Sequence, residues 1–195
     1  MTKWPQVSLG EIFDIARGGS PRPIDAYITD DPAGVNWIMI SDAREGSKYI
    51  DRTKKRIRAE GVVRSRTVQP GDFLLTNSMS FGRPYIMRTG GCIHDGWLVL
   101  RKGREEVDQD FFFHLLGSEA IYSEFVRLAA GATVKNLNID LVKSVKVGVP
   151  SLREQRRIAE VLDRVGNLRD QHRDAIARLD DLSASLQHRA FRGEL

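Results

Sequence analysis

The stretch VPSLREQRRI, residues 149–158, marks the point where the sequence changes character. Ser151 is a favoured residue for the N-cap of a helix, because its side-chain oxygen accepts a hydrogen bond from a free N–H of the first turn. Glu154 follows three residues later, where its carboxylate can bond back to the Ser151 N–H, so the pair predicts a capping box. Pro150 favours an extended entry to this segment. We therefore predict that a long helix begins directly after Ser151.

The segment that follows has a strict seven-residue hydrophobic repeat. Two series of core-type positions, three residues apart, run from Ile158 to Leu186. A repeat sustained over about four heptads predicts a coiled coil, because a helix that packs on a curved sheet drifts with the 3.6-residue period. A helix that folds back onto its own domain is the alternative. The predicted dimerisation residues are Ile158, Val161, Val165, Leu168, His172, Ala175, Leu179, Leu182 and Leu186.

Residues 1–150 have the pattern of a domain rich in strands. Short apolar or alternating runs are separated by turn sequences that contain Gly, Pro and Asp. These predicted strands lie at 35–40, 72–76, 84–88, 96–101 and 142–150. Two helices are expected from apolar residues on one face, at 7–16 and 108–129. We predict an α+β fold, in which a mixed or antiparallel-sheet domain (residues 1–150) precedes one long C-terminal coiled-coil helix (residues 151–195).

Composition and charge restrict the class of protein. The hydrophobic content of 41% is typical of a folded chain, and the net charge of +4 with a pI of about 9.4 permits a polyanionic partner without requiring one. Cys92 is the only cysteine, which excludes an intrachain disulfide and a zinc site built on paired cysteines. No apolar run is long enough to span a membrane, and the N-terminus has no apolar signal core. We expect a cytoplasmic protein with no membrane partner.

The patterns of the common enzyme classes are missing. The sequence has no G-x-G-x-x-G or G-x-x-x-x-G-K-[ST] phosphate loop, no Asn/Asp-Pro-Pro-aromatic tetrapeptide and no acidic residue followed two positions later by Lys. The four histidines do not cluster at metal-ligand spacing, so no metal site and no cofactor is expected in this chain. His94 and Asp95 are adjacent, but a hydrogen bond within a turn is a commoner role for such a pair than acid–base chemistry. The sequence therefore predicts a binding protein and not an enzyme.

Three segments carry side chains suited to DNA. Seven cationic residues lie between positions 52 and 66, including Arg64 and Arg66, against Glu60 alone. Such a basic run is suited to contacts with DNA phosphates. The alternative is a solvent-exposed strand or sheet edge that its charge keeps soluble. Residues 76–85 and 131–138 carry polar side chains that can bond base edges, although the Asn side chains of the second segment can instead cap the following strand. The candidate DNA-binding residues are Arg22, Lys48, Arg52, Lys54, Lys55, Arg56, Arg58, Asn77, Ser78, Arg83, Tyr85, Lys135 and Asn136.

Several short motifs occur in an order that resembles a known family. In chain order they are W-P-x-V-x-L-G-E-I, G-G-S-P, N-W-I with a following Asp, P-G-D-x-L-L, G-A-T-V-K-N-L-N, V-P-S-L-x-E-Q-x-x-I and A-F-x-G-E-L. They occupy residues 4–12, 18–21, 36–42, 70–75, 131–138, 149–158 and 190–195. The chain is similar in these motifs to the DNA-specificity (S) subunits of type I restriction–modification systems.

The resemblance implies a function. In that family a target recognition domain reads one half of a split DNA site, and a long helix follows it as a spacer. The subunit has no catalytic activity and positions methyltransferase (M) subunits, which bind S-adenosylmethionine, together with restriction (R) subunits in the full complex. The usual S subunit has two recognition domains and two helices, so this chain resembles half a subunit or a piece of a longer one. A coiled-coil interaction module without specific DNA recognition is the alternative function.

The heptad pattern also predicts how a second copy would pair. Closed homodimers are mostly two-fold symmetric. In an antiparallel pair, Val165 opposite the partner's Leu182 sets His172 opposite the partner's Ala175, which places the large polar core residue against the small one. A parallel pair would instead set two His172 side chains together. We therefore predict an antiparallel homodimer that reads an inverted repeat, with the helix length fixing the gap between half-sites.

Overall fold

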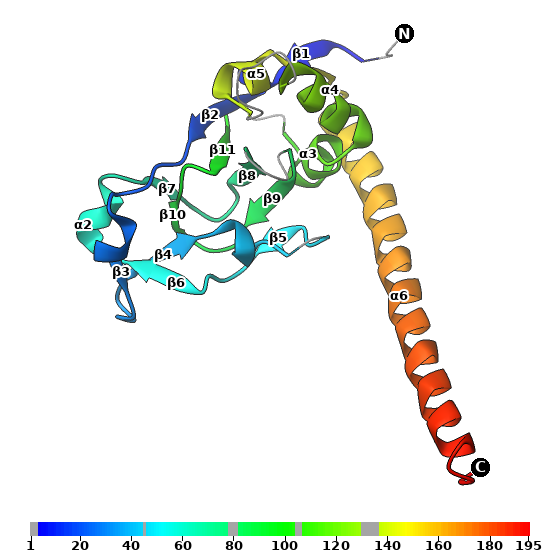
Figure 1. Cartoon of the computed structure of the whole chain (residues 1–195). Coiled ribbons are helices and arrows are strands. Elements are labelled where there is room, and N and C mark those ends of the chain that lie inside the picture. The colour runs from blue at the N-terminus through cyan, green and yellow to red at the C-terminus, as the bar shows by residue number, and fades with distance from the viewer. Residues whose placement is uncertain (1–3, 45, 78–81, 104–106, 130–136) are drawn as a thin grey trace. The chain divides into compact units, whose positions relative to one another are not determined.

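The computed structural model describes residues 4–44, 46–77, 82–103, 107–129 and 137–195. The chain divides into two compact units, Met1–Gln155 and Arg156–Leu195. The first unit contains all the strands among the described residues, and the second consists mainly of one helix (Figure 1).

Two five-stranded sheets form the frame of the first unit. One sheet has the order β3 (Ile28–Thr29), β6 (Lys55–Ile57), β4 (Val35–Ile38), β10 (Gly91–Ile93), β7 (Arg66–Val68). The other has the order β2 (Phe13–Arg17), β11 (Trp97–Lys102), β8 (Phe73–Thr76), β9 (Pro84–Met87), β5 (Tyr49–Ile50). The β10–β4 and β5–β9 pairs are parallel and the other pairs are antiparallel. A small antiparallel pair joins β1 (Gln6–Ser8) to β12 (Lys146–Gly148), so the predicted mixed and antiparallel pairing is confirmed.

The main core lies between the two five-stranded sheets. Its buried side chains come from both, with Ile38 and Ile93 from the first sheet and Leu74 and Val99 from the second. Trp97 is fully buried there, and its indole N–H donates to the Ile38 carbonyl at 3.3 Å. One side chain thus contributes both apolar area to the core and a polar bond between the sheets, as a buried tryptophan requires.

The outer face of each sheet is covered by helical segments. On the first sheet, Trp37, Ile57 and Cys92 pack under the segment that contains Ile24 and Tyr27. On the second sheet, helix α3 (Gln109–Leu116) places Phe112 edge-on to Phe13 of β2, with ring centroids 5.2 Å apart. Figure 1 shows α2 (Ala59–Val62) beside β3 at one end of this unit, and α3, α4 (Glu119–Ala129) and α5 (Ile139–Ser144) gathered at the other end.

The predicted strands at 35–40, 72–76, 84–88 and 96–101 are confirmed as β4, β8, β9 and β11. The predicted helix at 7–16 is wrong, because only the single turn α1 (Leu9–Ile12) is helical and β2 follows it directly. Phe13 and Ile15 are buried while Asp14 is exposed, which is the alternation of a strand. Pairing of β2 with β11 along the whole length of β2 stabilises the strand over the local helical preference.

Two other predicted elements, the helix at 108–129 and the strand at 142–150, are shorter in the structure than the sequence predicts. The helix expected at 108–129 is broken into α3 and α4 at Gly117, and the Ser118 hydroxyl donates to the Leu115 carbonyl at 2.7 Å at this break. The strand expected at 142–150 is shortened to β12, because Asn138 caps helix α5 by accepting from the Leu141 N–H at 2.8 Å. The alternative interpretation of residues 131–138, in which Asn side chains cap a following strand, is correct in that Asn138 is a capping residue and wrong in the element, because Asn138 caps helix α5.

The long helix α6 (Leu152–Ala190) begins where the capping pattern predicts. Its start belongs to the first unit, where the Gln155 side chain is completely buried. Gln155 Oε1 accepts from the Asp108 N–H, and Gln155 Nε2 donates to the Pro150 carbonyl, both at 2.9 Å. The amide thus bonds the N-cap residue of α3 and Pro150, which lies two residues before α6, at the same time.

The apolar seam of α6 is uncovered. Val161, Leu168 and Leu179 are 48%, 55% and 64% exposed, and Val165, Leu182 and Leu186 are similar. His172 and Ala175 are also exposed, whereas Ile158 is half-buried. Apolar side chains repeated at this spacing along one helix are typical of a helix that pairs with another.

Replacing Gln155 with Leu tests the polar link at the start of α6. The variant keeps about the same side-chain volume but removes the hydrogen bonds to the Asp108 N–H and to the buried Pro150 carbonyl, at about 1–3 kcal/mol each. We expect the free energy of unfolding to fall by about 2–4 kcal/mol in urea titrations followed by near-UV circular dichroism. Gln187→Leu, at an exposed position of the same helix, is the matched control. Equal stability of the two variants would contradict a stabilising role for the Gln155 bonds.

Candidate nucleic-acid interface

The turn between β10 and β11 joins segments that are distant in the sequence. Its Asp95 carbonyl accepts two hydrogen bonds at 2.9 Å, from Arg17 Nε at the end of β2 and from Asn77 Nδ2 just after β8. The turn is closed by a bond from the Trp97 N–H to the His94 carbonyl at 3.1 Å. A single backbone oxygen therefore fixes the ends of two strands at one place.

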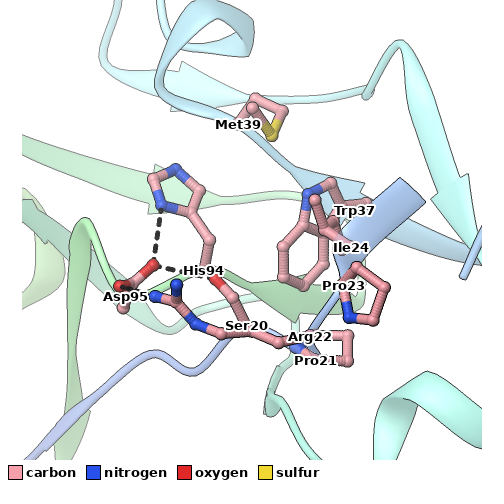
Figure 2. Close-up of a pocket in the computed structure, with 9 residues that line it drawn as sticks. All are labelled: Ser20, Pro21, Arg22, Pro23, Ile24, Trp37, Met39, His94 and Asp95. Carbon is pink, nitrogen blue, oxygen red and sulfur yellow. Dashed lines mark hydrogen bonds and ion pairs between the residues drawn. The ribbon is translucent and has the colours of Figure 1, made fainter. Parts of the chain in front are cut away.

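The Asp95 carboxylate holds a third segment at the same turn (Figure 2). Ser20 Oγ donates to Asp95 Oδ1 at 2.8 Å, and the Arg22 guanidinium lies 3.6 Å from Oδ2. The Ser20 hydrogen bond, with nearby positive charge, holds the pKa of Asp95 below its ordinary range. Asp95 is therefore ionised at neutral pH. Its negative charge is compensated by the Ser20 hydroxyl and the Arg22 guanidinium of the loop.

His94 is held in one tautomer by the same turn. Its Nδ1 accepts from the Gly96 N–H at 2.9 Å, so the neutral ring carries its proton on Nε2. Burial lowers the pKa of His94, although the neighbouring Asp95 charge opposes the shift. A Cβ at Gly96 would lie 2.4 Å from His94 Cε1, so a side chain there would displace the ring. This geometry supports a turn hydrogen bond for His94 and not an acid–base pair.

The G-G-S-P loop lies directly against this turn. The Gly18 N–H donates to the Trp97 carbonyl at 2.9 Å and the Gly19 N–H to the Ile93 carbonyl at 3.1 Å. A Cβ at Gly18 would lie 2.0 Å from the His94 carbonyl oxygen, a separation that no side chain tolerates. On the other side Ser65 Oγ donates to the same Ile93 carbonyl at 3.1 Å. The loop is therefore enclosed between two other segments.

Four arginines from these segments form a group at the surface, which we call the arginine cluster: Arg17, Arg22, Arg64 and Arg66. Arg66 Nε donates to the Arg17 carbonyl at 3.3 Å, and Arg64 donates to the Tyr27 hydroxyl at 3.2 Å. All four side chains are exposed. Arg22, Arg64 and Arg66 belong to the cationic residues singled out in the sequence, whereas Arg17 was missed because only the fold brings it to them.

Five of the predicted cationic residues, which we call the basic run, lie on the first sheet and its loops: Arg52, Lys54, Lys55, Arg56 and Arg58. Lys55 and Arg56 are on β6, between β3 and β4, and Arg58 stands just before α2. Arg52 and Lys54 are in the preceding loop, where the Lys54 N–H donates to Asp42 Oδ1 at 3.2 Å. The side chains of all five are exposed, which leaves their charges available to a polyanion.

Asn77 joins a further predicted segment to the turn. Its side chain is 1% exposed, its N–H donates to the Gly96 carbonyl at 3.0 Å and its carbonyl accepts from the Leu137 N–H at 3.1 Å. The end of segment 131–138 therefore meets the Asp95 turn through Asn77. Ser20, Asn77 and Leu137, which lie in three separate stretches of the sequence, are therefore linked at this turn.

Other predicted contact residues have internal partners. Lys48 Nζ lies 2.7 Å from Asp110 Oδ1 and its side chain is 16% exposed. The Tyr85 ring is buried and stands edge-on to Trp97 at 5.9 Å between centroids. Arg83 is exposed beyond Gly82, whose φ of +83° suits glycine. Whether Lys48, Asn77 and Tyr85 contact DNA stays a prediction, and the exposed arginines are better placed to do so.

Three candidates, Ser78, Lys135 and Asn136, lie outside the described residues. Within the part of the chain that the structure describes, no three His, Cys, Asp or Glu side chains are grouped to hold a metal ion. No helix in that part has the length and apolarity needed to cross a membrane.

Comparison with known proteins gives a consistent result. Residues 1–179 match the model of the type I restriction modification DNA specificity domain family. The EcoBI specificity subunit of a type I restriction enzyme from Escherichia coli is 26% identical over 202 residues, which cover 98% of this chain and 42% of that protein. The chain therefore spans less than half the length of this curated relative.

Two solved structures have the same fold as the whole chain. The HsdS subunit from Thermoanaerobacter tengcongensis matches with a TM-score of 0.72 at 23% identity, over 100% of this chain and 46% of that one. The second match is a chain from a structural study of complex assembly and conformational transition in the type I R-M system. It has a TM-score of 0.75 at 23% identity, over 100% of this chain and 47% of that one.

The buried His94 predicts an acid-sensitive stability. Its pKa in the folded chain lies below the ordinary value of 6.5, so the unfolded chain takes up the proton first as the pH falls. Stability is therefore complete above that value and declines below it. We expect the free energy of unfolding to decrease as the pH falls below about 6.5, and to decrease less in His94→Gln.

Urea titrations at a series of pH values measure this difference. His188→Gln, which makes the same substitution at an exposed position of α6, is the matched control. An unchanged slope in His94→Gln would show that protonation of this ring is not coupled to unfolding.

Proposed function

We propose that this chain, which belongs to the family of type I restriction modification DNA specificity domains, binds double-stranded DNA and reads one half-site of a bipartite target. The observation that carries the proposal is that Arg17, Ser20 and Asn77, from three separate stretches of the sequence, all bond Asp95, beside the arginine cluster. Polar loops held on a rigid frame, with exposed cations around them, are suited to base edges and phosphates together.

The charge distribution supports DNA as the partner. The cations of the arginine cluster and of the basic run are exposed, while Asp95, the acidic residue at the centre of the turn, is matched by Ser20 and Arg22. Contacts to phosphates supply affinity without sequence information, and base contacts supply the discrimination. We assign the first role to the cations and the second to the segments that converge on the turn.

The remaining parts of the proposal concern partners. We infer that the chain catalyses nothing itself and docks an M subunit, and an R subunit in the full complex. The relative from Escherichia coli is a specificity subunit of a restriction enzyme, and one structural match comes from a type I R-M complex, which supports this assignment. S-adenosylmethionine would then be bound by the M subunit.

The uncovered seam of α6 supports pairing with a second copy of the chain. An exposed apolar stripe of this length is stabilised by burial against a matching stripe, at about 25 cal/mol per Å² of apolar area. We propose an antiparallel pair in which Leu168 faces the partner's Leu179 and His172 faces the partner's Ala175. The two recognition units would then read an inverted repeat whose gap depends on the helix.

Reversing the charge of the basic run tests the DNA interface. We expect the triple variant Lys54→Glu, Lys55→Glu and Arg56→Glu to lose DNA affinity and to show a weaker salt dependence, by about one unit of slope for each phosphate contact removed. The measurement is fluorescence anisotropy with duplexes enriched from a randomised pool, over a series of salt concentrations.

The control makes the same charge change elsewhere. Lys102, Lys143 and Lys146 are exposed, and their replacement by Glu is expected to affect DNA binding much less. Unchanged binding by the Lys54, Lys55 and Arg56 variant, with its helix pairing intact, would favour a protein-interaction module over a DNA-binding one.

Cysteine cross-linking tests the orientation of the helices. In the antiparallel pair, Leu168→Cys mixed with Leu179→Cys forms a disulfide between chains, because bridged cysteines need Cα atoms about 4.4–6.8 Å apart. Leu168→Cys alone does not cross-link, since its two copies would lie about 16 Å apart along the helix at about 1.5 Å per residue.

Light scattering over a dilution series is the accompanying measurement, and we expect a mass of twice 22.0 kDa. Cross-linking of Leu168→Cys with itself would demonstrate a parallel pair. A monomer at all concentrations would show that the seam serves another protein or another segment of a longer chain.

A further inference from the structure

A pocket of about 530 Å³ opens beside the Asp95 turn. Its volume is within the range of about 300–1,000 Å³ that is usual for small-molecule sites. Figure 2 shows His94 and Asp95 on one side of it, and Trp37, Ile24 and Pro23 on the other. The apolar part of the lining consists of Pro21, Pro23, Ile24, Trp37 and Met39.

The pocket is already formed in the free chain. Trp37 is 2% exposed and its ring lies 6.2 Å from that of His94, so the floor is packed into the core. The loop that forms the opposite wall is fixed by the Ser20–Asp95 bond and by the contact of Gly18 with the His94 carbonyl. A preformed site avoids the entropic cost of ordering its walls on binding.

The rim of the pocket is polar and cationic. Ser20, Arg22 and Asp95 line it, and Arg17 reaches the same turn through the Asp95 carbonyl. Arg22 is 83% exposed at its side chain, and an exposed ion pair of this kind contributes little energy. Its guanidinium is therefore available to an anion without a large loss of stability.

These features together select a planar, mostly apolar group that carries a phosphate. We propose that the pocket receives one nucleobase unstacked from the bound DNA, with Arg22 contacting the adjoining phosphate; this inference rests on the proposed function. The faces of the base pack against the apolar walls, and its polar edge meets the Ser20 hydroxyl and the Asp95 carboxylate. An apolar side chain of a protein partner would fill the walls but would bring no anion to the exposed Arg22 guanidinium at the rim.

The first test uses the purified chain and free deoxynucleoside monophosphates. Binding in the pocket is expected to shift the indole N–H resonance of Trp37 in a saturable way. Ile24→Trp places a large ring in the pocket and is expected to abolish the shift, whereas Val126→Trp on α4, outside the pocket lining, keeps it. If circular dichroism shows Ile24→Trp to be unfolded, Met39→Phe takes its place. A missing shift, or one that persists in the filled variant, overturns the proposal.

The second test uses a duplex enriched from a randomised pool, with a single mismatch placed at each position in turn. A mismatch lowers the cost of unstacking a base, so one position is expected to bind about tenfold more tightly than the matched duplex. Ile24→Trp is expected to lose this gain while keeping the salt dependence of phosphate contacts.

The outcomes separate this inference from the proposed function. Specific binding in which every mismatch weakens affinity overturns the pocket assignment and leaves the proposed function intact. Binding of nucleotides without binding of any duplex overturns both the proposed function and the assignment of the occupant to DNA.

Discussion

The Asp95 carbonyl is the acceptor on which the recognition surface depends. Arg17 and Asn77 both donate to it, and the Asp95 carboxylate holds Ser20 in the loop alongside. Because the central acceptor is a backbone oxygen, no substitution removes it directly. The backbone bonds of the turn are therefore kept when the side chains around it are substituted, which suits the proposed DNA-binding surface.

The features that the sequence predicted well are those that depend on local chemistry. The start of α6 follows from Ser151 and its neighbours, and its seam follows from the seven-residue spacing. The helix expected at 7–16 was wrong for the opposite reason: Leu9 and Ile12 fit a helical face, but pairing of β2 with β11 over residues distant in the sequence decided the outcome. Strand pairing of this kind leaves no short-range signal.

The candidate site was predictable in composition but not in arrangement. Asn77 has the chemistry of a base-reading residue, yet in the fold it is buried and bonds the backbone of two other segments. Nothing in the sequence around Arg17, apart from the two glycines that follow it, indicated that it belongs to the site. Its place there follows from the hydrogen bond that it donates to the Asp95 carbonyl. The acceptors at this turn are main-chain oxygens, which a sequence does not display, so residue type alone could not show where the segments meet.

Charge and pairing are connected in the proposed function. A net charge of +4 gives one copy of the chain only a modest attraction to DNA, and much of its specific contact has to come from a small polar surface. Two such surfaces joined through the α6 seam bind as one bivalent unit, because the second contact is made at a high effective concentration. Each unit alone would bind its half-site weakly. The pair would bind tightly only where both half-sites occur at the spacing that it can span. In the proposed function, specificity therefore needs both features: the small surface that contacts each half-site and the seam that joins two such surfaces.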